Sequence, residues 1–248
     1  MVVSYYGNPY TGLMGVLGQL SKDELVSALK RRAAQYEAAS GRPVQPAIHF
    51  IATVAQAGAG SDGMYRARMP MELVQEYAQL AADNGMLFII DIQFGRSTAQ
   101  AEIPPWLPVL KLPHVHLAID PEFDMWANEL ASIDLGHMTA AEVNYASDYL
   151  SSIVIQYSLP NKILVVHQFT ASMLPDKANI QTNPKVDLVI DMDGFGGRAV
   201  KIDHYNYYVG EQAIQFAGIK LFLEHDVNLM SAEDIMALNP KPDFVIYQ

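Results

Sequence analysis

The chain contains no cysteine among its 248 residues, which excludes disulfide bonds, thiolate metal sites and a cysteine nucleophile. Basic residues are scarce as well: 16 Lys and Arg stand against 27 Asp and Glu, for a net charge of −11. Nucleic acids and anionic membranes bind clustered Lys and Arg, so neither is an expected partner. A neutral or cationic small molecule, or a carbohydrate, suits this charge better.

Long apolar runs are also missing. No stretch approaches the roughly 18 apolar residues that span a bilayer. The first ten residues lack the basic segment and apolar core of a signal peptide. There is no repeat, linker or low-complexity run, so we expect one domain over residues 1–248 of a compact soluble protein.

Two signatures of known catalytic sites are absent too. The glycine-rich segments 58–63 and 194–197 lack the lysine of a phosphate-binding loop, and we interpret them as flexible loops over a site. No serine lies in a Gly-x-Ser-x-Gly elbow, which disfavours an α/β-hydrolase mechanism. No cofactor is expected from these patterns.

What the chain does contain is a regular alternation of apolar runs with helical patterns. The eight expected strands are residues 2–6, 47–53, 87–92, 115–119, 162–167, 188–191, 219–223 and 244–247. Capping boxes at Ser21–Glu24 and Thr139–Glu142 mark the starts of two intervening helices. Alternating strands and helices indicate a parallel sheet, and eight units favour a (β/α)₈ TIM barrel. An open doubly wound sheet is the alternative.

Polar residues fall where these strands end, at the edge that carries the active site in α/β barrels. They are Asp91 and Gln93, Asp120 and Glu122, His167, Asp191 and Asp193, and Lys220 and Glu224, each pair in one strand phase. A charged group within an apolar strand is destabilising by several kcal/mol unless it is paired. Their presence on several strands therefore predicts one converging acidic cluster with a histidine and a lysine.

Each of these residues also has a structural interpretation. Asp120 and Asp191 could cap the loops that follow them, and Asp91 could form an ion pair with Lys220 or Arg96. His167 could be a buried imidazole bound by a carboxylate. For Lys220, a structural counter-ion is favoured over a Schiff-base nucleophile. His49, in the middle of its strand, is interpreted as a core histidine.

Several short segments resemble a family of bacterial, largely actinobacterial, TIM-barrel proteins that are described as lipoproteins. These segments are Tyr6-Gly-Asn-Pro, Ile51-Ala-Thr-Val-Ala-Gln-Ala, Asp62-Gly-Met-Tyr-Arg, Asp91-Ile-Gln-Phe-Gly-Arg, Ala118-Ile-Asp-Pro-Glu, Val166-His-Gln-Phe and Gly218-Ile-Lys-Leu-Phe. The resemblance covers nearly the whole chain. It implies an export origin for the full-length protein and no catalytic assignment.

The leading functional hypothesis is a metal-independent glycoside hydrolase, which needs two carboxyl groups facing one sugar. One pairing takes Asp120 as nucleophile and Asp191 as acid; the other takes Glu122 as acid and Glu224 as nucleophile. The residues expected to bind substrate are Asp91, Gln93, His167, Asp193, Lys220, Tyr6 and Trp126. The two aromatic side chains are included because they can stack on sugar rings.

Two other functions remain open. In a metal-dependent hydrolase of a phosphoester or lactone, a divalent ion would be held by His167, Asp91, Asp120, Glu122 and Asp191. The inward lysine disfavours this reading, because it competes for the same carboxylates. A sugar-binding barrel without turnover is the non-enzymatic alternative.

Overall fold

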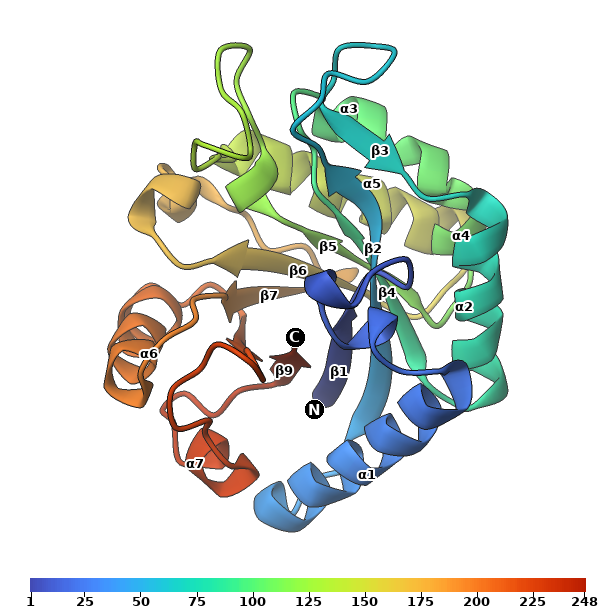
Figure 1. Ribbon diagram of the computed structural model, residues 1–248. Helices are drawn as coiled ribbons and strands as arrows, with labels where there is room; N and C mark the ends of the chain where they lie inside the picture. Colours follow the sequence, from blue (N-terminus) through green and yellow to red (C-terminus); the bar gives the residue numbers. More distant parts are fainter.

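Eight parallel strands form a closed barrel in the computed structural model, which describes residues 1–248 (Figure 1). The barrel strands are β1 (Val2–Gly7), β2 (Gln45–Ala55), β4 (Leu87–Ile92), β5 (Val115–Ile119), β6 (Lys162–Gln168), β7 (Val186–Met192), β8 (Phe216–Leu221) and β9 (Phe244–Tyr247). The first strand pairs in parallel with both β2 and β9, which closes the sheet. The predicted (β/α)₈ barrel is confirmed, and the open sheet is excluded.

Helices surround the barrel (Figure 1). They are α1 (Lys22–Ser40), α2 (Met71–Asp83), α3 (Ala99–Glu102), α4 (Leu107–Leu110), α5 (Ala140–Tyr157), α6 (Arg198–Tyr205) and α7 (Ala232–Met236). Both predicted capping boxes are present, at the starts of α1 and α5. The connection from β6 to β7 has only two 3-10 turns, Ala171–Met173 and Lys177–Asn179, so the helical ring is incomplete there. No helix is both long and apolar enough to cross a membrane.

A short antiparallel strand, β3 (Arg66–Arg68), pairs with the end of β2 and was not expected from the sequence. The glycine-rich segment 58–63 forms the turn between these two strands. Glu102 of α3 is fully buried and accepts hydrogen bonds from Arg66 Nε at 2.8 Å and Arg68 Nε at 2.7 Å. The hairpin is therefore anchored to α3 by ion pairs at its β3 side.

The strand predicted at 219–223 is shifted in the structure. β8 begins at Phe216, because Ala217 and Gly218 pair with β7 although neither residue favours strands. It ends at Leu221, and the chain turns where the Phe222 N–H donates to Asp226 Oδ2 at 2.9 Å. The expectation that Glu224 faces inward with Lys220 is thus corrected, because Glu224 lies within this turn and is exposed.

The apolar core has two parts. A cluster of 55 buried residues fills the space between the strands and the helices. A second cluster of 11 buried residues includes Ile89, Ala118, Val165 and Val189, whose side chains occupy the barrel interior. Polar side chains replace these apolar ones toward the carboxyl ends of the strands. The barrel interior is thus filled with apolar side chains toward the amino ends of the strands and with polar ones toward their carboxyl ends. This places the site at the carboxyl-end mouth of the barrel.

Gly218 links this packing to the site, because β7 approaches it closely. A β-carbon at Gly218 would lie 2.8 Å from Val189 Cγ1 and 3.0 Å from Asp191 Oδ1. We expect Gly218→Ala to lower the free energy of unfolding by about 1–3 kcal/mol, as overpacked interiors do. Urea denaturation measures the change.

The matched control is Gly58→Ala, where nothing lies within 4 Å of the added carbon, and we expect a change below about 0.5 kcal/mol. Equal stability of the two variants would contradict the tight contact between β7 and β8.

Candidate active site

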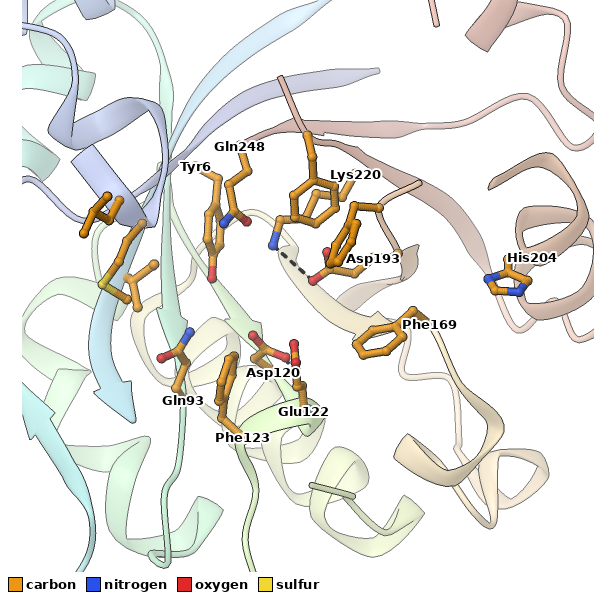
Figure 2. A pocket seen from close by; sticks show the side chains of 16 residues that line it. Tyr6, Gln93, Asp120, Glu122, Phe123, Phe169, Asp193, His204, Lys220 and Gln248 are labelled. Atoms are coloured by element: carbon orange, nitrogen blue, oxygen red, sulfur yellow. Dashed lines mark hydrogen bonds and ion pairs between the residues drawn. The ribbon is translucent and has the colours of Figure 1, made fainter. Parts of the chain in front are cut away.

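A cavity of about 430 Å³ opens at the carboxyl ends of the barrel strands (Figure 2). Its volume lies in the range of small-molecule sites. The polar side chains that line it are Gln93, Asp120, Glu122, Asp193, His204, Lys220 and Gln248. The apolar and aromatic ones are Tyr6, Leu13, Met14, Ile51, Phe123, Phe169, Phe195 and Phe222. Six residues predicted to form the site are therefore brought together at one cavity: Tyr6, Gln93, Asp120, Glu122, Asp193 and Lys220.

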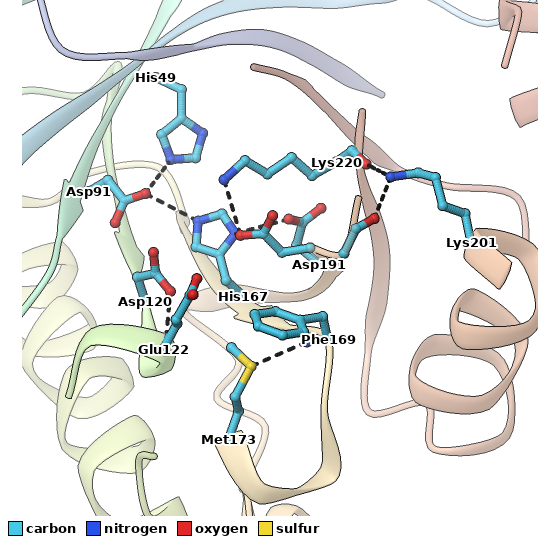
Figure 3. Close-up of polar contacts among 12 residues, drawn as sticks. His49, Asp91, Asp120, Glu122, His167, Phe169, Met173, Asp191, Lys201 and Lys220 are labelled. Carbon is cyan, nitrogen blue, oxygen red and sulfur yellow. Dashed lines mark hydrogen bonds and ion pairs between the residues drawn. The ribbon is translucent and has the colours of Figure 1, made fainter. Parts of the chain in front are cut away.

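Beneath the cavity lies a fully buried network of charged groups centred on His167 of β6 (Figure 3). The His167 ring has Nδ1 2.9 Å from Asp191 Oδ2 and Nε2 3.1 Å from Asp91 Oδ2. Asp193 Oδ2 lies 3.3 Å from His167 Nδ1, and His49 Nε2 lies 3.2 Å from Asp91 Oδ2. The carboxylates that surround the His167 imidazole of β6 thus come from β4 and from the end of β7, and His49 of β2 joins the network through Asp91.

The electrostatics of this network favour a protonated His167. Burial by itself lowers the pKa of His167, but hydrogen bonds to Asp191 and Asp91 outweigh burial and raise that pKa well above its ordinary value. Burial raises the pKa of Asp91, but the charge of His167 outweighs it and holds that pKa well below the usual range. His49 has no such surplus of acidic partners, and burial lowers its pKa. The centre is therefore an imidazolium between carboxylates.

Lys220 of β8 connects this network to the cavity. Its Nζ donates to Asp193 Oδ2 at 3.0 Å and lies 3.8 Å from the centroid of the Tyr6 ring. Burial lowers the pKa of Lys220, but the surrounding aspartates, Asp193 first, outweigh burial and raise it. A lysine held positive in this way is a poor nucleophile, which agrees with the predicted counter-ion role.

Asp120 and Glu122 lie at the carboxyl end of β5 and face the cavity without a cation of their own (Figure 2). Asp120 is 2% exposed and caps the turn Pro121–Phe123 by accepting from the Glu122 N–H at 3.3 Å. Burial raises the pKa of Asp120 well above its ordinary value, and Asp91 and Glu122 add to the rise. Burial and the neighbouring Asp193 also raise the pKa of Glu122. The cavity therefore contains carboxyl groups that keep a proton more readily than ordinary ones.

Other expected residues lie apart from the cavity wall. Asp91, His167 and Asp191 are fully buried and belong to the network beneath it. Glu224 is exposed and accepts a hydrogen bond from Gln19 Nε2 at 3.0 Å. Trp126 is 62% exposed, with its ring centroid 4.1 Å from that of His137. The structure therefore does not bring Glu224 or Trp126 to this site.

Several lining residues had no signal in the sequence patterns that we used. Phe123, Phe169 and Phe195 follow strands at positions where loops are irregular, so their direction does not obey the alternation of a strand. Gln248 follows β9, the one barrel strand with no polar residue in the predicted phase. His204 reaches the cavity from helix α6, whereas the site was predicted from the ends of strands alone.

Two groups of side chains have the spacing of metal ligands: His49, Asp91 and His167, and His167, Asp191 and Asp193. His167 belongs to both, yet each of its nitrogens faces a carboxylate oxygen. An imidazole that donates from both nitrogens has no lone pair for a metal ion. Asp193 Oδ2 also forms an ion pair with Lys220 Nζ at 3.0 Å, so a metal ion would compete with the lysine for this oxygen. These residues therefore fit a proton-holding network better than a divalent cation.

Comparison with known proteins does not assign the chain to a family. No protein-family model matches the sequence, and no curated protein matches it either. The geometry of the cavity and of the network beneath it is therefore the basis for the functional proposal.

The buried ion pairs give a testable consequence for stability. We expect Asp91→Asn to lower the free energy of unfolding at pH 7 by about 3 kcal/mol, because it removes a partner from a buried charge. A carboxylate with a depressed native pKa contributes stability above its unfolded pKa and loses it as the pH falls. The deficit of the variant should therefore shrink between about pH 5 and pH 3. Urea denaturation across this range measures it.

Asp203→Asn, at an exposed position of α6, is the control and should change stability by less than about 0.5 kcal/mol. A deficit for Asp91→Asn that is equally small would show that Asp91 is not ionised against His167.

Proposed function

We propose that the protein is a glycoside hydrolase in which Glu122 is the general acid and Asp193 is the carboxylate that acts as nucleophile or base. The observation that carries this proposal is the contrast between two carboxyl groups at one cavity. Asp193 lies 3.0 Å from Lys220 Nζ and 3.3 Å from His167 Nδ1, whereas Glu122 forms no ion pair. Glycosidases use two carboxyl groups with opposite protonation states in this way.

The proposed pair keeps Glu122 from one of the two pairings expected from the sequence and joins it with Asp193, which was expected to bind substrate. Of Asp120 and Asp191, only Asp120 lines the cavity; of Glu122 and Glu224, only Glu122 does. Burial raises the pKa of Asp120 well above its ordinary value, which favours the protonated form. A protonated carboxyl group donates a hydrogen bond and is no nucleophile, so Asp120 suits a role in holding a sugar hydroxyl.

The chemistry requires one proton and one electron pair. Glu122 donates its proton to the glycosidic oxygen while the bond from that oxygen to the anomeric carbon breaks. In one form of the reaction Asp193 bonds to the anomeric carbon as the leaving group departs. Water, deprotonated by the Glu122 carboxylate, then takes the place of Asp193 on that carbon and restores both groups. In the other form Asp193 takes a proton from the water that attacks the anomeric carbon. Burial raises the pKa of Asp193 overall, but Lys220 and His167 oppose that rise. The two cations, 3.0 and 3.3 Å away, stabilise the carboxylate form of Asp193 directly, and Glu122 has no such ion pair. The rings at the cavity wall supply faces against which a sugar can stack.

A metal-dependent hydrolase is supported less well, because the two groups with ligand spacing share a histidine whose nitrogens both face carboxylates. A sugar-binding barrel without turnover has the same cavity. What favours catalysis over binding is the raised pKa of Glu122, since perturbed carboxyl groups in clefts are typical of catalytic acids.

The first experiment is a panel of nitrophenyl glycosides and phosphoesters, assayed with and without EDTA, for the wild type and Glu122→Gln. We expect cleavage of at least one neutral glycoside to survive EDTA and kcat to fall about 10²- to 10⁴-fold in the variant, because the proton donor is lost. A dinitrophenyl glycoside, whose leaving group needs no proton, should be cleaved nearly as fast by the variant as by the wild type.

Glu211→Gln, at an exposed position remote from the cavity, serves as the matched control and should keep wild-type rates. Activity that is confined to phosphoesters and abolished by EDTA would overturn the glycosidase proposal. Sugar binding without any turnover would favour the binding protein.

The pH dependence of kcat/KM follows from the same pair. The general acid must be protonated, so activity is lost as the pH rises through the raised pKa of Glu122. The partner must be ionised, so activity is also lost as the pH falls through the pKa of Asp193. Because Lys220 lowers the pKa of Asp193, Lys220→Met should move the acidic limb of the profile to higher pH.

The profile is measured on a substrate that the panel identifies, with thermal unfolding as a check that the variant is folded. A folded Lys220→Met variant with an unmoved acidic limb would contradict the assignment of Asp193.

A further inference from the structure

The cavity has two chemical zones at different depths. Its polar groups are deep: Asp120, Asp193 and Lys220 are 2%, 6% and 3% exposed. Its outermost groups are apolar: Leu13 is 95% exposed and Phe195 is 67% exposed. We call the deep groups the floor and these two outermost side chains the rim.

An aromatic wall runs continuously from the floor to the rim. Lys220 Nζ lies 5.2 Å from the centroid of the Phe222 ring, and Phe222 is buried. The Phe222 ring packs edge-on against Phe195, with centroids 5.7 Å apart. Phe123 and Phe169 face the same cavity (Figure 2). A ligand seated on the polar floor therefore has apolar surface beside it all the way to solvent.

This order is the reverse of an ordinary protein interface, where the centre is apolar and the edge is polar. Single exposed apolar residues are common, but here they gather at one end of the molecule. Nine of the thirteen exposed large hydrophobic side chains belong to loops that follow barrel strands: Tyr10, Leu13, Trp126, Ile133, Leu135, Phe195, Leu223, Val227 and Leu229. The mouth therefore suits a ligand whose polar part goes in first and whose apolar part stays outermost.

We propose that the natural substrate is an amphiphilic glycoside, with a neutral sugar on the floor and an apolar alkyl or aryl aglycone against the rim. This inference rests on the glycosidase function proposed above and specifies its substrate class. An anionic head group is disfavoured by three carboxyl groups at the cavity, Asp120, Glu122 and Asp193, and by the net charge of −11. A wholly hydrophilic oligosaccharide would leave the exposed surfaces of Leu13 and Phe195 uncovered.

The test uses butyl, hexyl and octyl glycosides of the sugar that the nitrophenyl panel identifies, all below their critical micelle concentrations. A half-buried methylene is worth about a twofold gain in kcat/KM, so we expect about a 16-fold rise from butyl to octyl. In the double variant Leu13→Ser/Phe195→Ser the rise should fall below about fourfold, because half or more of the apolar contact is removed.

Ile155→Ser is the matched control, because Ile155 on α5 is also 67% exposed and lies in the last turn of its helix, away from the mouth. It should keep the full dependence on chain length. Glycosides that are cleaved at the same rate whatever their chain length would overturn the inference and leave the glycosidase function standing.

A panel without any cleavage would instead refute the glycosidase function. The role of the rim is then tested by calorimetry, which compares the binding affinities of methyl and octyl β-glucoside. Octyl glucoside that binds no tighter than methyl glucoside would overturn the inference as well. Tighter binding of octyl glucoside that is lost in the double variant would support an amphiphile site without glycosidase chemistry.

Discussion

The balance of charge inside the barrel is the constraint on which the site depends. Asp91, Asp191 and Asp193 are buried together with His167 and Lys220, where an unpaired ion would be destabilising by several kcal/mol. Each cation lies within hydrogen-bond distance of at least one carboxylate oxygen. Because four strands, β4, β6, β7 and β8, supply the members, the network depends on the native register of these strands.

The same pairing explains why the cavity retains acidic groups with unusual proton affinity. His167 and Lys220 lie against the aspartates of the network, so no cation pairs with Asp120 or Glu122. Burial raises the pKa of both carboxyl groups and outweighs the charges of His167 and Lys220, which lower it without forming an ion pair. The ion pairs of the buried network and the raised pKa of the two cavity carboxyl groups therefore have the same cause, which is the position of the two cations.

The sequence predicted the eight barrel strands and most of the polar side chains that line the cavity, because apolar runs, capping boxes and polar strand ends are local features. It could not predict depth: Asp191 and Asp193 share a strand phase, yet Asp193 lines the cavity and Asp191 lies beneath it. It also misplaced Glu224, since β8 ends at Leu221 and the side chain of Asp226 closes the turn that follows, which the alternation of the strand does not reveal. The β3 hairpin was missed because its ion pairs to Glu102 join residues distant in the chain.

The floor and the rim of the cavity come from different kinds of backbone. The buried ionic network is built on strands, whereas Leu13 and Phe195 belong to loops and take no part in any ion pair. A change at the rim therefore leaves the buried ionic balance intact, while a change within the network alters folding as well as chemistry. Ligand preference can accordingly diverge during evolution in small steps, loop by loop, above a buried network that stays the same.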